Sequence, residues 1–236
     1  MKSWHTKSGL QIIRILAGRS NVFLLSNSKK NILIDTSPAN KWNKLNKSLR
    51  ENNIDHIDFL LLTHSHYDHA DNAASIKNKF GCPVIVHRDE EHNLKTGEIT
   101  APKGTNPITR FIVDNFAHRF ADRLKCIPCH PDILVESEYD LTVYGFNAYI
   151  LHTPGHSPGS LSLIVDNEIA LVGDTMFGVS PWSSFPPYAA DASLLVSSWG
   201  TLLKTNCGIF LPSHGGLKYR SQLLKEYQRR KTKYSR

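Results

Sequence analysis

The stretch Asp58-Phe59-Leu60-Leu61-Leu62-Thr63-His64-Ser65-His66-Tyr67-Asp68-His69 joins an apolar run directly to a cluster of polar residues. The apolar run predicts a buried strand, and the hexapeptide after it holds four potential metal ligands in six residues. Three imidazoles and a carboxylate crowded at the end of a buried strand would be costly unless a cation organised them. The segment therefore predicts a metal site delivered by a strand.

Isolated histidines often lie on the surface or form hydrogen bonds in a core, so the histidines of the hexapeptide could also have a purely structural role. Three further polar motifs follow the hexapeptide: Thr153-Pro154-Gly155-His156, Gly173-Asp174-Thr175 and Pro212-Ser213-His214-Gly215. Each motif offers one more histidine or aspartate with the chemistry of a metal ligand. Together the four motifs favour a metal centre over a set of unrelated structural histidines.

These motifs, in this order, resemble the metallo-β-lactamase-fold hydrolases, and the resemblance spans about residues 10–216. It implies an α/β fold, namely a four-layer αββα sandwich with two central sheets covered by helices and the metals at one sheet edge. It also implies two metals held by seven residues. The first metal would be bound by His64, His66 and His156, the second by Asp68, His69 and His214, and both by Asp174.

The residue types suit this chemistry in their own right. Imidazole with carboxylate suits Zn²⁺ and also fits Fe and Mn, so we expect two Zn²⁺ per chain with Fe or Mn as alternatives. Two cations roughly 3.5–4 Å apart can share a water and lower its pKa towards neutrality. Asp68 is the candidate catalytic residue, because its carboxylate could orient the resulting hydroxide and accept a proton as well as bind metal.

Length and composition predict one domain over residues 1–236. The chain is 40% hydrophobic and 21% charged, and its candidate ligands are dispersed from residue 64 to residue 214 with no linker between them. Short β-rich runs at residues 11–16, 21–26 and 31–35 predict an antiparallel meander. We expect further strands at residues 83–87, 141–151, 160–165, 169–173 and 208–211. We expect helices at residues 38–52, 71–80, 107–124, 192–205 and 221–231.

The formal charge of +7 and the pI near 9.2 raise the question of a nucleic-acid partner. Much of the excess lies after residue 217, where eight basic residues oppose only Glu226. We interpret this segment as a solvated helix face or tail rather than a binding groove. The sequence shows no nuclease-specific signature and no inserted cap domain, which argues against nucleic acid as the partner and favours a small-molecule substrate.

The N-terminal region has no apolar run typical of a signal peptide, and no segment approaches a membrane-spanning length. We therefore expect a cytoplasmic protein without a membrane partner and with reduced thiols at Cys82, Cys126, Cys129 and Cys207. The segment Cys126-Ile127-Pro128-Cys129-His130 matches the haem-attachment pattern, but covalent haem normally accompanies export. An ordinary connection is the preferred interpretation, with a redox pair or minor metal site as alternatives.

Three other features have both a functional and a structural interpretation. Asp35 could support a metal ligand or only form a turn. His118, among the aromatic residues of the expected insertion helix, could face a substrate mouth, although such a stripe more often packs on the core. The aromatic and proline-rich segment Phe177–Asp191 could form an apolar wall for an acyl group or pack on that helix.

The resemblance does not settle the subfamily. Metallo-β-lactamases themselves are disfavoured because they generally lack a carboxylate at the position of Asp174 and are exported. The seven candidate ligands resemble the complete ligand set of glyoxalase II. However, only 22 residues follow His214, so its helical glutathione-binding region has no counterpart, and its Gly-Cys-Gly-Arg stretch is absent from residues 176–182. Persulfide dioxygenases share that stretch and are doubted for the same reason, whereas acyl-homoserine lactonases keep all seven ligands.

We therefore expect a dinuclear, zinc-dependent hydrolase of the glyoxalase II-like branch in the broad sense, cleaving an ester, thioester or lactone. A mononuclear iron oxygenase resembling persulfide dioxygenases is the first alternative, and a metal-dependent phosphodiesterase or nuclease is the second. Retention of seven candidate ligands argues against a non-catalytic binding protein. The native substrate, the physiological metal and the oligomeric state stay open, as do the roles of the Cys126-Cys129-His130 cluster and of the basic C-terminal segment.

Overall fold

The computed structural model describes residues 2–99, 102–120 and 125–234, and its strands form two large sheets. The first sheet has seven strands in the order β1-β2-β3-β4-β5-β6-β8. Its strands are β1 (Ser3–His5), β2 (Gln11–Leu16), β3 (Val22–Ser26), β4 (Asn31–Ile34), β5 (Phe59–Leu61), β6 (Val84–His87) and β8 (Ile133–Val135). β1 to β4 pair antiparallel, which confirms the expected meander, and β4, β5, β6 and β8 pair parallel.

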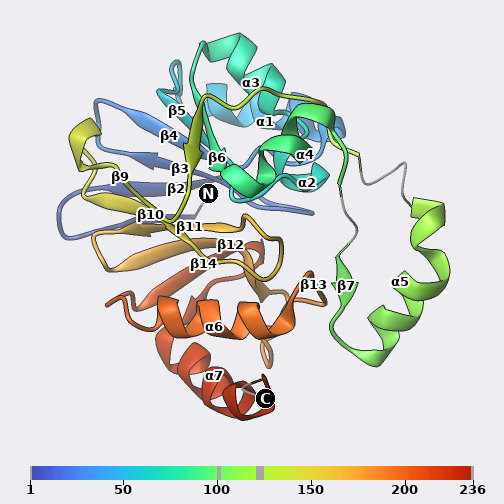
Figure 1. Cartoon of the computed structure of the whole chain (residues 1–236). Helices are drawn as coiled ribbons and strands as arrows, with labels where there is room; N and C mark the ends of the chain where they lie inside the picture. Colours follow the sequence, from blue (N-terminus) through green and yellow to red (C-terminus); the bar gives the residue numbers. More distant parts are fainter. Residues whose placement is uncertain (1, 100–101, 121–124, 235–236) are drawn as a thin grey trace.

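The second sheet has six strands in the order β15-β14-β12-β11-β10-β9. They are β9 (Glu138–Asp140), β10 (Ala148–His152), β11 (Leu161–Val165), β12 (Ile169–Gly178), β14 (Ile209–Gly215) and β15 (Lys218–Tyr219). The helices are α1 (Trp42–Glu51), α2 (Tyr67–Ala70), α3 (Ala73–Phe80), α4 (Glu91–Thr96), α5 (Pro107–Phe120), α6 (Ala192–Leu202) and α7 (Arg220–Tyr234). Helices lie on the outer side of each sheet (Figure 1).

Three hydrophobic clusters explain this layering. Alternate residues of a strand point to opposite faces of its sheet, so in β3 Phe23 joins the cluster between the two sheets, while Leu24 joins the cluster beneath α1 and α3. A third cluster packs α6 and α7 against the second sheet, around the fully buried Trp199. Because each sheet is buried on both faces, the order of layers is helix, sheet, sheet, helix, which confirms the expected αββα sandwich.

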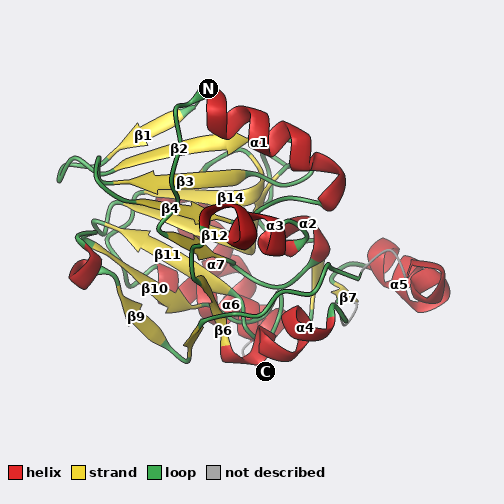
Figure 2. Ribbon diagram, turned by 90° about the horizontal axis from the view of Figure 1, so that it is seen from above, coloured by secondary structure: helices red, strands yellow, loops and turns green. Residues whose placement is uncertain are grey.

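Helix α5 stands apart from these layers in both ribbon views (Figures 1 and 2). Short strand β7 (Lys103–Gly104) connects it to the body by pairing antiparallel with β13 (Tyr188–Ala189). Ile108 and Phe111 of α5 are largely exposed. For Phe111, the expectation that the aromatic stripe of this helix packs on the core is therefore wrong.

The expected element bounds need several corrections. The strand expected at residues 141–151 begins only at Ala148, because Asp140 accepts hydrogen bonds from the backbone and hydroxyl of Thr142 and starts a 3₁₀ turn that ends at Gly145, whose φ is +88°. The strand expected at residues 169–173 continues to Gly178, since it pairs with β14 as far as Gly215. The helix expected at residues 38–52 is a 3₁₀ turn (Ala39–Lys41) followed by α1. The end of the helix expected at residues 107–124 lies outside the described residues.

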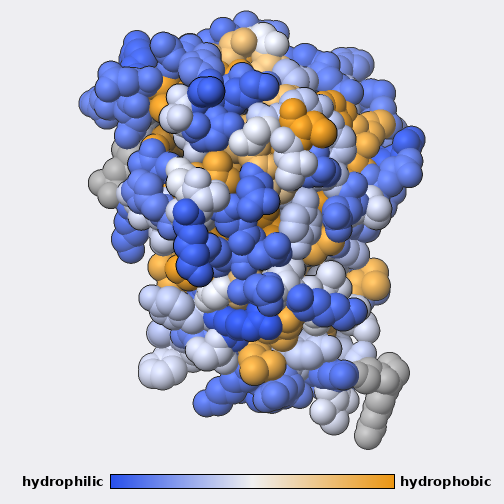
Figure 3. Space-filling view, turned by 90° about the vertical axis from the view of Figure 1, so that its left-hand side faces the viewer, coloured by the Kyte–Doolittle hydropathy of each residue, from blue (hydrophilic) through white to orange (hydrophobic). Residues whose placement is uncertain are grey.

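The face shown in Figure 3 is largely hydrophilic, with apolar residues scattered over it. Among the described residues, no helix combines the length and apolar character needed to cross a membrane.

Candidate metal centre

The seven candidate ligands reach one place from both sheets. β5 ends just before the loop that carries His64 and His66, and α2 carries Asp68 and His69. The other three come from the second half of the chain: His156 follows β10, and Asp174 and His214 lie within β12 and β14. The sequence motifs thus converge where ends of the two sheets meet.

The first set consists of three imidazoles. Nδ1 of His66 lies 2.9 Å from Nε2 of His64 and 3.0 Å from Nε2 of His156. Four-coordinate zinc with Zn–N bonds of about 2.0–2.1 Å requires nitrogens about 3.3 Å apart, so a small outward adjustment would accommodate an ion. These three residues are one of the groups whose ligand atoms lie within 4.8 Å of one another.

The second set consists of Asp68, His69 and His214, whose ligand atoms also lie within 4.8 Å of one another. Nε2 of His69 lies 3.8 Å from Oδ1 of Asp68, and Nε2 of His214 lies 3.6 Å from Oδ2 of Asp68. This set therefore places two imidazoles and one carboxylate around a common point.

Asp174 lies between the two sets. Its Oδ2 is 3.4 Å from Nε2 of His156 and 3.2 Å from Nε2 of His214, while its Oδ1 is 3.6 Å from Nε2 of His69. Oδ1 of Asp174 and Nε2 of His69 are both buried and lack a hydrogen-bond partner within the described part of the protein. Orphaned buried polar atoms of this kind are costly. The donor set therefore fits binding of divalent metal.

Neighbouring groups fix the orientation of the imidazoles. The Nδ1 atoms of three histidines have partners outside the centre: Thr63 Oγ1 for His64, Asp35 for His69 and the carbonyl of Tyr188 for His156. In each case Nε2 is left facing the centre. This arrangement is typical of metal-binding histidines, whose second nitrogen is held by a hydrogen bond.

Electrostatics differ between the two sets. Burial, together with neighbouring His69, lowers the pKa of His64 well below its usual value, and burial beside His156 lowers the pKa of His66 to about 4. Burial acts the same way on His69, but the carboxylates of Asp174, Asp35 and Asp68 outweigh it and raise the pKa of His69 to about 10. The imidazoles of the first set are thus neutral nitrogen donors, whereas the carboxylates around the second set stabilise positive charge.

Glu90 is a functional candidate that the sequence motifs missed. The residue is only 1% exposed, although it lies far from every candidate ligand in the sequence. Oε2 accepts hydrogen bonds from the backbone and hydroxyl of Ser65, and Oε1 accepts one at 3.0 Å from the backbone of Gly159. Burial alone would raise the pKa of Glu90, but hydrogen bonds from Ser157 and Ser65 lower it. Glu90 therefore joins the His64-Ser65-His66 loop to the loop that carries His156.

Asp35 is the other supporting carboxylate, and here the functional interpretation from the sequence matches the geometry. Its φ is +62°, so it also forms a turn after β4. Arg19 approaches the centre from the surface, with Nε 3.6 Å from Oδ2 of Asp68 and its guanidinium carbon 5.2 Å from the ring centre of Tyr67.

A fourth His and Asp group has a structural explanation. His87 and His152 stack with ring centres 3.8 Å apart, beside Asp89. Nε2 of each ring donates to a backbone carbonyl, that of Glu136 or that of Pro158, and Nδ1 of His87 accepts from the backbone of Asp89. These contacts account for the pair without a metal.

The aromatic residues of the Phe177–Asp191 segment lie in different surroundings. Phe177 stacks on His214 at 4.5 Å, whereas Phe185 packs on Trp199 of α6 and Trp182 is exposed. The side chain of His118 lies outside the described part of the structure.

Cys126 and Cys129 are buried free thiols. Their backbone N–H groups donate to the carbonyls of Gly97 and Leu94, respectively, in and just after α4.

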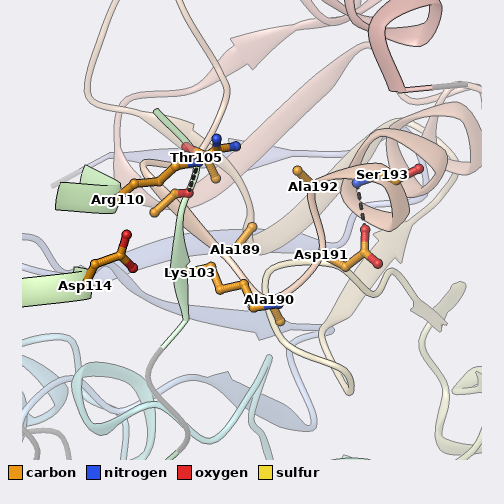
Figure 4. A pocket seen from close by; sticks show the side chains of 10 residues that line it. Lys103, Thr105, Arg110, Asp114, Ala189, Ala190, Asp191, Ala192 and Ser193 are labelled. Atoms are coloured by element: carbon orange, nitrogen blue, oxygen red, sulfur yellow. Dashed lines mark hydrogen bonds between the residues drawn. The ribbon is translucent and has the colours of Figure 1, made fainter. Parts of the chain in front are cut away.

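A cleft of about 450 Å³ lies between the α5 arm and the start of α6 (Figure 4). Its wall on the arm side contains Lys103, Thr105, Arg110 and Asp114, and its opposite wall is formed by residues 189–193. The backbone N–H of Ala190 in that wall donates to the carbonyl of His156. A backbone hydrogen bond thus connects this wall of the cleft to the loop that carries His156.

Comparison with known proteins finds a matching family and several relatives. A family model described as the metallo-beta-lactamase superfamily matches residues 15–214. The chain is 36% identical over 166 residues to a probable metallo-hydrolase of Methanocaldococcus jannaschii, covering 69% of this chain and 71% of that protein. It is 29% identical over 212 residues to the hydroxyacylglutathione hydrolase GloC of Haemophilus influenzae, covering 87% and 90% of the two chains.

Solved structures share the architecture. An archaeal metallo-beta-lactamase superfamily protein from Sulfolobus tokodaii matches with a TM-score of 0.63 and 19% identity, over 89% of this chain and 80% of that one. A metallo-beta-lactamase from Cronobacter sakazakii matches with a TM-score of 0.68 and 15% identity, over 100% and 93%. At these identities the likeness shows the fold alone.

Proposed function

This chain belongs to the metallo-β-lactamase superfamily and is a metal-dependent hydrolase, and on this premise we propose that it hydrolyses a carboxylic thioester at a pair of zinc ions. Esters and lactones belong to the same proposal, because they require the same attack on a carbonyl carbon. A thioester comes first because a relative that aligns with 87% of this chain is named a hydroxyacylglutathione hydrolase.

The position of Asp174 is the observation that carries the proposal. Its two carboxylate oxygens face histidines of both sets, and one of those oxygens is buried without a partner among the described residues. A carboxylate placed in this way would bridge two cations and offset their mutual repulsion. We assign the first ion to His64, His66 and His156 and the second to Asp68, His69 and His214.

Such a metal pair would supply an activated water and an electrophile for the substrate carbonyl. The side chains of the protein would do the rest. Asp68, whose carboxylate reaches the centre, would hold the attacking water and accept its proton. Asp35 and Tyr188 would keep the rings of His69 and His156 in place through the Nδ1 hydrogen bonds. In the overall reaction the carbon–sulfur bond breaks, the acyl carbon gains a hydroxyl group, and the thiol leaves with a proton.

Elemental analysis of the purified protein tests the proposal, together with a hydrolysis screen over S-lactoylglutathione, an acyl-homoserine lactone and bis(p-nitrophenyl) phosphate. We expect about two zinc ions per chain and turnover of the thioester. One iron per chain with oxygen consumption would replace the proposal by the oxygenase alternative. Two metals with turnover of the phosphodiester alone would replace it by the phosphodiesterase alternative.

A further inference from the structure

The ring of His214 is held differently from the other imidazoles of the metal centre. Three of the other histidines use Nδ1 for a hydrogen-bond partner outside the centre. Within the described residues, Nδ1 of His214 has no such bond. The ring of Phe177 stacks on His214 instead, with ring centres 4.5 Å apart and an angle of 29° between the two planes. A stacked ring, rather than a hydrogen bond, therefore orients this imidazole.

Phe177 is supported in turn by the loop that follows it, residues 179–187. Phe177 is the register partner of His214 on the neighbouring strand, but the pairing of β12 with β14 is irregular between Gly173 and Phe177. The backbone N–H of Phe177 donates at 2.8 Å to the carbonyl of Ser184. Because the strand pairing is interrupted just before Phe177, this bond is a second support for the ring that stacks on His214.

Glu226 of α7 holds the same part of the loop. It is the only acidic residue after residue 217, and it is 8% exposed. Oε1 of Glu226 accepts a hydrogen bond at 2.8 Å from the backbone N–H of Ser184, and the hydroxyl of Ser183 donates to Oε2 at 3.4 Å. A buried carboxylate is costly without such partners. Ser184 is thus bonded to Glu226 through its N–H and to Phe177 through its carbonyl.

Arg230 strengthens this anchor. It lies one turn after Glu226, with Nε 3.9 Å from Oε2 of Glu226 and its guanidinium carbon 3.8 Å from the ring centre of Phe185. Helix α7 therefore holds residues 183–185 through a buried carboxylate and a cation–π contact. The matched family model ends at residue 214, so this anchor lies outside the matched region.

We propose that Glu226 is a positioning residue for the metal ligand His214 and acts on it through Ser184 and Phe177. The inference rests on the ligand set of the proposed function and adds the C-terminal helix to the metal centre. Without the carboxylate, the loop at Ser184 would be free to shift. The ring of Phe177 would then no longer hold the imidazole of His214 in one orientation.

Cobalt substitution tests the proposal, because the visible spectrum of bound Co²⁺ reports the geometry of its ligands. Glu226→Ala should change this spectrum and lower the cobalt affinity by about 3- to 10-fold, since loss of a direct partner of a ligand costs about 10- to 100-fold. Glu226→Gln keeps an acceptor for the N–H of Ser184 and should restore most of both. A wild-type spectrum and affinity in Glu226→Ala would overturn the proposal.

Leu223→Ala is the matched control on the same helix. The side chain of Leu223 is fully buried in the cluster around Trp199 and cannot form a hydrogen bond to the loop. Its truncation opens a cavity and should lower the stability of the protein while keeping the wild-type cobalt spectrum. If Leu223→Ala changes the spectrum as Glu226→Ala does, the effect comes from helix packing and the proposal is wrong.

A double-mutant cycle tests the path through Phe177. Phe177→Leu removes the stacked ring but keeps the backbone N–H that bonds to Ser184. If Glu226 acts through that ring, the double variant of Glu226→Ala with Phe177→Leu should bind cobalt about as weakly as Phe177→Leu alone. Losses that simply add would show that Glu226 does not act on His214 through Phe177.

Nuclear magnetic resonance separates this inference from the function on which it rests. The ring current of Phe177 shifts the signals of the His214 ring whatever the metal content of the protein, and His214→Gln identifies those signals by their loss. Glu226→Ala should move them towards their positions in Phe177→Leu. Unmoved signals would overturn the inference and leave the proposed function intact. A wild-type protein that binds no cobalt would overturn the proposed function itself, whatever the signals show.

Discussion

Nδ1 of His69 donates a hydrogen bond to Oδ2 of Asp35 over 2.8 Å, in a region where both side chains are almost fully buried. Asp35 also accepts from the backbone of Thr63 at 2.8 Å and from the hydroxyl of Ser213 at 3.0 Å. One carboxylate thereby ties together the ends of β4, β5 and β14. Because the ring of His69 is held from behind, its Nε2 faces Asp174.

Replacement of Asp35 by Asn should weaken metal binding. The amide keeps the size of the side chain but loses the charge and turns one acceptor into a donor, which conflicts with the several donors around it. Loss of such a supporting partner typically costs about 10- to 100-fold in metal affinity. Competition with a chromophoric chelator measures this. Asp55→Asn removes an exposed carboxylate beside His56 and should leave the affinity unchanged; equal affinities for the two variants would contradict the assigned role.

Replacement of Glu90 by Gln should loosen the first set of imidazoles. The new amide group would face the N–H of Gly159 or that of Ser65, so at least one of the two loops would lose its tie. The three nitrogens of that set would then be less well aligned, and we expect a fall in metal affinity of about 10-fold. The visible spectrum of the cobalt-substituted protein should change as well, which a general loss of stability would not produce.

Glu91→Gln is the matched control for Glu90, because the carboxylate of Glu91 is partly exposed to solvent and pairs with Lys95 one turn away. It should keep the wild-type cobalt spectrum. A wild-type spectrum in Glu90→Gln as well would show that the carboxylate between the loops has no influence on ligand geometry.

Replacement of Asp174 by Ala should remove one or both metals and nearly all turnover. Without the carboxylate, two cations would repel each other and His69 and His214 would lose the charge that raises their pKa. Metal content per chain, measured on folded protein, should fall from about two to one or less. Asp89→Asn alters the stacked His87 and His152 group instead and should keep both metals. A fully active Asp174→Ala variant would exclude the proposed mechanism.

The sequence predicted the positions of the candidate ligands better than the elements around them. Six consecutive residues after an apolar run carry four of the candidate ligands, and the local pattern is enough to single them out as candidates. By contrast, Asp174 was expected just beyond a strand but lies inside β12, because that strand is extended by pairing with β14. The extension is a tertiary effect that no local pattern in residues 169–178 reports.

Glu90 shows why part of the site could not be predicted. It lies in a polar run, Arg88-Asp89-Glu90-Glu91, where a solvated surface is the natural expectation. The β10–β11 loop approaches it so closely that a Cβ on Gly159 would lie 2.5 Å from Cγ of Glu90. A carboxylate that becomes functional through contacts between distant loops leaves no signal in its own neighbourhood.

The buried cysteines give a prediction about pH. Burial raises the pKa of Cys82 to about 11 and that of Cys126 to about 12, from 9.0 for an unperturbed thiol. At pH 8 a shift of two units lowers the thiolate fraction of Cys82 by about 100-fold, so Ellman's reagent should react far more slowly with the folded than with the unfolded protein.

The same two thiols make the stability depend on pH, because they keep their protons in the folded state while the unfolded chain loses them above pH 9. The free energy of unfolding should therefore fall as pH rises from about 9 towards 11–12. Urea unfolding at pH 8 and pH 10.5 measures this, and a double Cys82→Ala, Cys126→Ala variant should show a smaller fall. Rapid labelling of the folded protein at pH 8 would instead favour the redox-pair interpretation of Cys126 and Cys129.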